Sequence, residues 1–171
     1  KPGPCETALV HPIAPLDPAA MTGIVSGIHP QNLARTPIGA SLRAVREVRS
    51  LRYKKRFGII RHAVKAANER AGFRIVEFSV QSNHLHLLIE ADDARVLGRG
   101  MQALNIRIAR RINKLVGRSG RVFSDRYHRH DLKTPREVRN GLAYVLNNFR
   151  KHAHQNGQRC LRGWVDPCSS G

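Results

Sequence analysis

Two runs of alternating residues constrain the fold more than any other part of this sequence. Residues 73–80 and 84–90 alternate between apolar and polar positions, and only Gln81, Ser82 and Asn83 separate them. A period of two is typical of half-buried strands, and such a short connection joins antiparallel neighbours. The sequence therefore predicts an antiparallel hairpin.

Further periodic segments flank this hairpin on both sides. A weak alternation predicts a strand over residues 38–44, and residues 121–133 are expected to hold another. Helical spacing predicts a helix within 52–72, a second over 93–116 and a third over 134–152. This order of elements predicts an α+β domain, with helices packed on a ferredoxin-like antiparallel sheet.

The last two helices have clear signals. Asp93 is a capping residue for the second helix, and Thr134, Pro135 and Glu137 form a start signal for the third. The expected apolar stripe of the second helix is Leu97, Met101, Leu104, Ile108, Ile112 and Leu115. The expected stripe of the third is Val138, Leu142, Val145 and Phe149.

Composition suggests one folded unit with loose ends. We expect residues 1–36 to be a poorly ordered, proline-rich leader, 37–153 to be the domain, and 154–171 to be a frayed tail. The three cysteines are odd in number and show no C-x-x-C spacing, so they are interpreted as incidental thiols. With no secretory signal and no long apolar run, the expected location is the cytoplasm, with no membrane partner.

The charge balance points to a polyanionic partner. Thirty Lys and Arg against twelve Asp and Glu give a net charge of +18, which favours nucleic acid binding. A solvated helix face is the ordinary explanation of such charges, but few acidic residues accompany them between Arg95 and Arg129. The candidate DNA-binding residues are Arg99, Arg107, Arg110, Arg111, Lys114, Arg121 and Arg126.

The hairpin carries two histidines on one face. His84 and His86 alternate with Leu85, Leu87 and Ile89, so the leucines and the isoleucine can be core while the imidazoles face elsewhere. Hydrogen-bonded strand histidines are the ordinary interpretation of an H-x-H pair. The alternative is that two neutral imidazoles bind one divalent ion, with a third ligand from another element.

The third helix offers partners for such a site. A rotation of about 100° per residue places Tyr144 and Asn148 together and off the expected apolar stripe. There they can present a phenol nucleophile and an amide ligand to one point. Phosphodiester cleavage needs such a nucleophile, together with an electrophile that polarises the phosphate.

These residues resemble a known family. The stretch "SNHLHLLIE" resembles the HUH motif, and "TPREVRNGLAYVLNNFRKH" resembles the catalytic helix of the REP-associated tyrosine transposases, which are HUH single-tyrosine transposases. The resemblance implies the HUH endonuclease fold, with Mg²⁺ or Mn²⁺ bound by His84, His86 and Asn148. It also implies that Tyr144 attacks single-stranded DNA and forms a 5′-phosphotyrosine link.

The resemblance is incomplete at two places. Relatives often have proline where Phe149 stands, and bulkier residues where Gly39 and Ala40 stand. The resemblance does not separate a monomer from a homodimer with shared sites. Of the other candidates, Tyr127 is interpreted as structural or DNA-contacting, and the second H-x-H, His128 and His130, as exposed basic surface outside the metal site.

Three functions stay open on the sequence. The first is a metal-dependent single-stranded DNA endonuclease or transposase that acts at hairpin or palindromic elements. The second is a domesticated, non-cleaving DNA- or RNA-binding protein on the same scaffold. The third is a small zinc protein, since imidazole suits zinc well.

Overall fold

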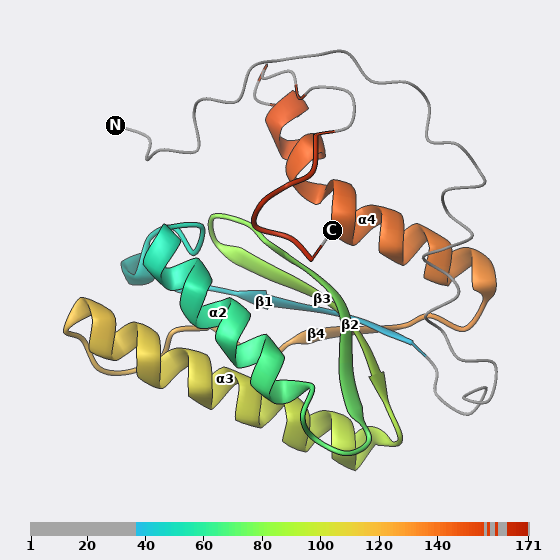
Figure 1. Cartoon of the computed structure of the whole chain (residues 1–171), viewed down its shortest axis with the longest axis horizontal. Helices are drawn as coiled ribbons and strands as arrows, with labels where there is room; N and C mark the ends of the chain where they lie inside the picture. The colour runs from blue at the N-terminus through green and yellow to red at the C-terminus, as the bar shows by residue number, and fades with distance from the viewer. Residues whose placement is uncertain (1–36, 156, 158–159, 161–163, 171) are drawn as a thin grey trace.

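The computed structural model describes residues 37–155, 157, 160 and 164–170. The expected leader, residues 1–36, lies outside the described residues. A sheet of four strands, with helices on both of its faces, makes up the described domain (Figure 1). No helix in these described ranges is long and apolar enough to cross a membrane.

The sheet has the order β2-β3-β1-β4, and every neighbouring pair is antiparallel. The strands are β1 (Ile38–Arg43), β2 (Phe73–Val80), β3 (His84–Ala91) and β4 (His128–Asp131). β1 and β2 are joined through a helix and separated by β3, which is the split βαβ arrangement of ferredoxin-like folds. The α+β prediction and the hairpin of β2 and β3 are confirmed.

One face of the sheet carries the main core. Helices α2 (Lys54–Ala67) and α3 (Ala94–Val116) pack on each other and on this face, after a short 3-10 helix, η2 (Arg46–Val48). Leu42, Leu85, Leu87, Ile89 and Ile108 are fully buried there. Burial of these side chains is the main stabilising contribution, because each removes a large apolar area from water.

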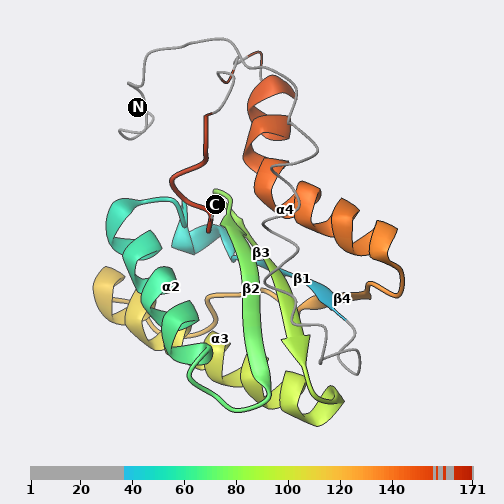
Figure 2. The same cartoon turned by 45° about the vertical axis from the view of Figure 1, so that its right-hand side comes forward.

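Among the described residues, the opposite face carries one helix, α4 (Pro135–Gln155), which packs on β2 and β3 (Figure 2). Its apolar contact is a small cluster of Leu88, Leu132 and Leu142, bordered by Val76 and Val138. Since α4 lies over β2 and β3, the β1 and β4 side of this face is less covered.

The helix boundaries follow capping. The Val96 amide donates to Asp93 Oδ1 at 2.7 Å, as predicted for the start of α3. For α4, the Glu137 amide donates to Thr134 Oγ1 at 3.2 Å, and the Thr134 amide donates to Glu137 Oε2 at 3.1 Å. This is the expected capping box. α3 ends at Gly117, whose φ of 66° suits glycine.

Two expectations were wrong at element ends. Leu115 is 40% exposed, so the buried stripe of α3 ends at Ile112. The C-terminal segment is also not frayed where it is described. The Val80 amide donates to the Cys168 carbonyl, and the Ser170 amide to the Phe78 carbonyl, so residues 168–170 lie along the edge of β2. Cys168 is buried against the core.

Candidate active site

The strand register places the two histidines on the α4 face. His86 pairs with Ser41 of β1 and with Ser79 of β2, and His84 pairs with Arg43. The two imidazole rings are stacked, with centroids 5.9 Å apart. Leu85, Leu87 and Ile89 take the other face and are fully buried. The alternation therefore separates core from candidate site as the sequence predicted.

Helix α4 brings Tyr144 onto the second histidine. The ring of Tyr144 meets the ring of His86 edge-on, with centroids 5.4 Å apart and an interplanar angle of 89°. Tyr144 remains 48% exposed. A phenol that is exposed, and held against an imidazole from a different element, is placed to meet a large substrate.

Asn148 lies one turn further along α4 and is only 1% exposed. The expectation that it lies off the buried side of the helix was wrong. α4 is covered from two directions, because the neighbouring Phe149 packs on Trp164 and under the guanidinium of Arg52. Phe149, the residue that departs from the family pattern, therefore helps to hold this turn of α4 in place.

The amide of Asn148 has no hydrogen-bond partner among the described residues, at either Oδ1 or Nδ2. A buried amide without a partner costs about 1–3 kcal/mol in folding stability. Such a group in a native protein calls for an explanation, and a bound ion is one of the ordinary ones.

The protonation of the histidines also fits metal binding. Burial, with smaller contributions from His84 and His152, lowers the pKa of His86 to about 4. Burial, followed by the charges of Arg43, His152 and His128, lowers the pKa of His84. His84 Nδ1 lies 2.8 Å from Asn83 Oδ1, so a proton on Nδ1 leaves Nε2 free as a ligand.

The side chains of His84, His86 and Asn148 have the chemistry of ligands for a small divalent cation. Two neutral imidazoles and one amide oxygen form a mixed N/O set, which suits Mn²⁺ and accommodates Mg²⁺. Within the described ranges, no cluster of three His, Cys, Asp or Glu side chains is placed to bind a metal. Those residues thus do not form the Cys and His set of a structural zinc site.

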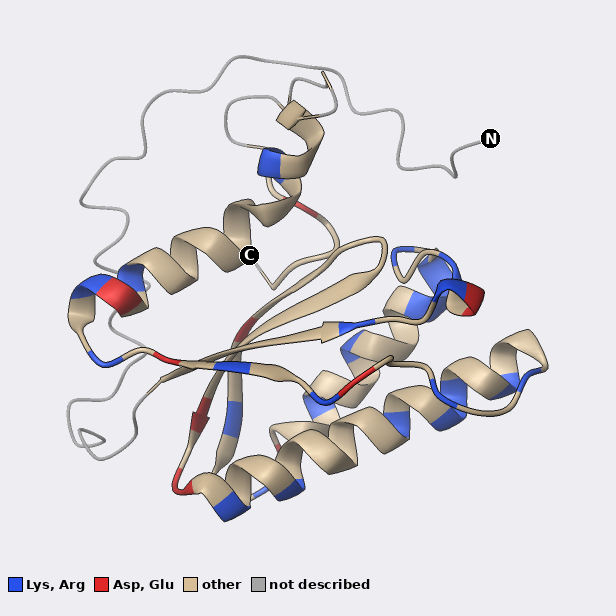
Figure 3. Ribbon diagram, turned by 180° about the vertical axis from the view of Figure 1, so that it is seen from behind, with Lys and Arg blue, Asp and Glu red and all other residues tan. Residues whose placement is uncertain are grey.

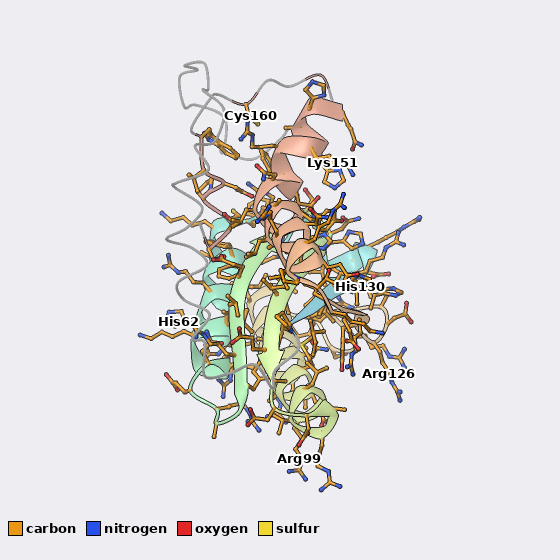
Figure 4. All side chains as sticks on the ribbon, turned by 90° about the vertical axis from the view of Figure 1, so that its right-hand side faces the viewer. His62, Arg99, Arg126, His130, Lys151 and Cys160 are labelled. Atoms are coloured by element: carbon orange, nitrogen blue, oxygen red, sulfur yellow. The ribbon has the colours of Figure 1, made fainter. Side chains whose placement is uncertain are left out.

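The candidate DNA-binding residues on α3 lie on the other side of the sheet from Tyr144. Those on α3 are all exposed except the half-buried Arg107, and α3 packs on the sheet face opposite α4 (Figure 3). Arg99 on α3 and Lys151 on α4 project at opposite ends of the molecule (Figure 4). Arg121 and Arg126 are exposed in the segment between α3 and β4. The structure does not bring the α3 residues together with the tyrosine.

Three residues beside the site were missed in the sequence. His128 and His130 were expected to be basic surface outside the site, and they are exposed, but with His86 and Tyr144 they line one cavity. β4 pairs with β1 through Ser41 opposite His128, which sets His128 and His86 on one row of the sheet. Arg43 is the third, through its pairing with His84. The pairing of β4 with β1 identifies the two histidines and the pairing of β1 with β3 identifies Arg43, and the sequence supplies neither register.

The sequence matches the family model described as transposase IS200-like over residues 44–148. The chain therefore belongs to the IS200-like transposase family. No curated protein matched the sequence.

Two solved structures are similar to this one. A REP-associated tyrosine transposase, solved bound to a REP hairpin, is 19% identical, with a TM-score of 0.52 and 68% coverage of each chain. A Deinococcus radiodurans R1 protein, solved as a candidate transposase, is 14% identical, with a TM-score of 0.48 and coverage of 74% of this chain and 92% of that one. The first similarity supports the fold.

Proposed function

We propose that this chain is a metal-dependent single-stranded DNA endonuclease and transposase, with Tyr144 as its nucleophile. The observation that carries the proposal is the contact of Tyr144 with His86, and one helical turn further along α4 Asn148 holds a buried amide with no partner among the described residues. Membership of the IS200-like transposase family supports the same chemistry. Tyr144, His86 and Asn148 belong to one chain, so a monomer, or each subunit of a homodimer, has the components of a site.

The reaction is a transesterification. The Tyr144 phenol loses its proton, its oxygen forms a bond to phosphorus, and the bond from phosphorus to the 3′ oxygen breaks. The 3′ oxygen takes up a proton, and the 5′ end of the downstream strand stays linked to Tyr144. Attack by a 3′ hydroxyl reverses the step without ATP, because the phosphotyrosine link conserves the bond energy.

The protein's own groups orient this step. The His86 ring makes a T-shaped contact with the Tyr144 ring. Phe149 packs on Trp164 and so fixes the turn of α4 that carries Asn148. Mg²⁺ or Mn²⁺, held by His84, His86 and Asn148, would polarise the scissile phosphate. Arg43, paired with His84, adds a positive charge beside the same place.

The proposed substrate is single-stranded DNA next to a hairpin or palindromic repeat. A net charge of +18 favours a polyanion. A REP hairpin is what the similar transposase was solved with, and this chain is proposed to take DNA of that kind.

Incubation with Mn²⁺ and hairpin DNA that carries single-stranded flanks tests the proposal. A covalent adduct that resists denaturation should form with the native protein and with Tyr53→Phe, a control at another exposed tyrosine. It should be lost in Tyr144→Phe. A 3′ label on the DNA should travel with the protein, and a 5′ label should be released.

A non-cleaving DNA- or RNA-binding protein is the second candidate. The observation that favours it is the position of the basic α3 surface, on the sheet face opposite Tyr144. Retained DNA binding without an adduct, across a library of flanking sequences, would support this function instead.

A further inference from the structure

A cavity of about 520 Å³ extends from Tyr144 and His86 along the less covered side of the α4 face. Its walls are β1, β3, β4 and the first half of α4. It exists because α4 packs on β2 and β3 and leaves the β1 and β4 side of this face open. The volume is in the usual range for a site that takes one small organic group.

Small residues keep this cavity open. Gly39 of β1 lines it, and a Cβ at this position would meet only the carbonyl and Cβ of His130, the nearer of them at 3.6 Å. A larger side chain at position 39 would therefore extend into free space. On α4, a Cβ at Gly141 would lie 2.9 Å from Leu132 Cδ1. Gly39 therefore leaves space beside β1, whereas Gly141 allows α4 to pack closely on Leu132.

The lining has two chemical characters. Leu88, Leu132 and Val145 supply an apolar surface, and His130 and Asn140 supply exposed groups that donate and accept hydrogen bonds. Glu137 also lines the cavity, but its Oε2 already accepts from the Lys133 and Thr134 amides. A flat ring with hydrogen-bonding edges matches this combination, whereas a bare phosphate would leave the apolar surface without a partner.

We propose that this cavity holds one unpaired DNA base, from the nucleotide next to the phosphate that Tyr144 attacks. The inference rests on the proposed function for the position of the phosphate. The cavity and the tyrosine share a wall, so a strand with its phosphate at Tyr144 directs the adjoining base toward Gly39. Contact of the base with Leu88 and Val145 removes apolar surface from water, and His130 and Asn140 meet its polar edge.

Amide-detected NMR of the full chain tests the cavity without needing the target sequence. Each of the four deoxynucleoside 5′-monophosphates is titrated in turn, with 2-deoxyribose 5-phosphate as the probe that lacks a base. At least one nucleotide should shift the Gly39 and Gly141 amides, and the sugar phosphate should leave them unchanged. Equal shifts with the sugar phosphate would show a phosphate site and overturn the proposal.

Gly39→Leu provides the matched substitution. Leucine suits a strand better than glycine does and has space at this position, so the variant should stay folded. It should bind the preferred nucleotide about tenfold more weakly, from the loss of base contacts. Gly58→Leu, on α2 with open space around it, should bind as the native protein does. Unchanged nucleotide binding by folded Gly39→Leu would overturn the proposal. Gly39→Ala is a second variant that fills less of the cavity and should weaken nucleotide binding less.

The covalent assay keeps the two proposals apart. Base-dependent shifts without a Tyr144 adduct would retain the base site and remove the strand-cutting function. An adduct without base-dependent shifts would retain the strand-cutting function and remove the base site.

Discussion

The ring edge of Tyr144 on α4 rests against the imidazole of His86 on β3, with the centroids 5.4 Å apart. The contact joins a helix and a strand that are distant in sequence, and both are fixed independently of it. The capping box of Thr134 and Glu137 fixes the start of α4, and Phe149 against Trp164 fixes its later turns. The proposed nucleophile is therefore held in place before any substrate binds.

Asn148→Leu should raise the stability of the apo protein while it weakens metal binding. Leucine has a similar volume and removes two buried polar atoms that have no partner among the described residues. The free energy of unfolding of the apo protein should rise by about 1 kcal/mol in denaturant titrations with EDTA. Mn²⁺ affinity, measured by calorimetry, should fall by about tenfold or more.

Asn147→Leu is the control for that change. The Asn147 side chain donates to the Ala143 carbonyl at 2.9 Å and takes no part in the site. Its Mn²⁺ affinity should equal that of the native protein. A large loss of apo stability in Asn148→Leu would contradict the account, because it would mean that the amide has a structural partner.

The stability of the apo protein should fall in mild acid because of His86. Its pKa in the folded protein is about 4, below the ordinary 6.5, because burial disfavours the charged ring. The unfolded chain therefore binds this proton first, so stability is complete above pH 6.5 and is lost progressively as the pH falls toward 4. Denaturant titrations in EDTA should show a loss of roughly 2 kcal/mol across this interval.

The His86→Gln variant should show a flatter profile between these pH values. His154→Gln, at an exposed position near the end of α4, should follow the native curve. An equally steep loss in His86→Gln would assign the acid sensitivity to other groups.

The C-terminal segment should contribute to stability through Arg52 and Asp166. Arg52 donates to both carboxylate oxygens, at 2.6 and 2.8 Å, and the Asp166 side chain is 1% exposed. Asp166→Ala should lower the free energy of unfolding by about 3 kcal/mol, because it leaves a largely buried guanidinium without this partner. The matched exposed pair is Arg129 with Asp131. Asp131→Ala should cost less than about 1 kcal/mol.

The basic residues of α3 should affect binding rather than chemistry. Replacement of Arg99, Arg110 and Lys114 by alanine should reduce the salt dependence of single-strand binding by about two in log–log slope, if each contacts one phosphate. The cleavage rate at saturating DNA should not change, because α3 lies on the sheet face opposite Tyr144. Arg43→Ala, beside His84, should instead lower that rate. Loss of the saturated rate in the α3 variant would contradict this division.

Alternation and capping signals within single segments predicted the strands and helices well. The burial of Asn148 and the position of His128 were not predicted, because they depend on packing between segments distant in the chain. Alternation was enough to set His84 and His86 apart from the core, and capping signals were enough to place the start of α4. Asn148 is buried although it lies off the expected apolar stripe, and the next residue, Phe149, packs on Trp164 from further along the chain. The place of His128 in the site depends on the pairing of β4 with β1. Neither relationship has a signal within one element.

Peptide mapping of the DNA adduct tests the central claim most directly. The protein has three tyrosines, and trypsin should release Tyr144 in the peptide of residues 140–150. After incubation with Mn²⁺ and hairpin DNA, followed by nuclease and trypsin digestion, mass spectrometry should find a 5′-phosphonucleotide on Tyr144 alone. A nucleotide on Tyr53 or Tyr127, with Tyr144 unmodified, would contradict the account.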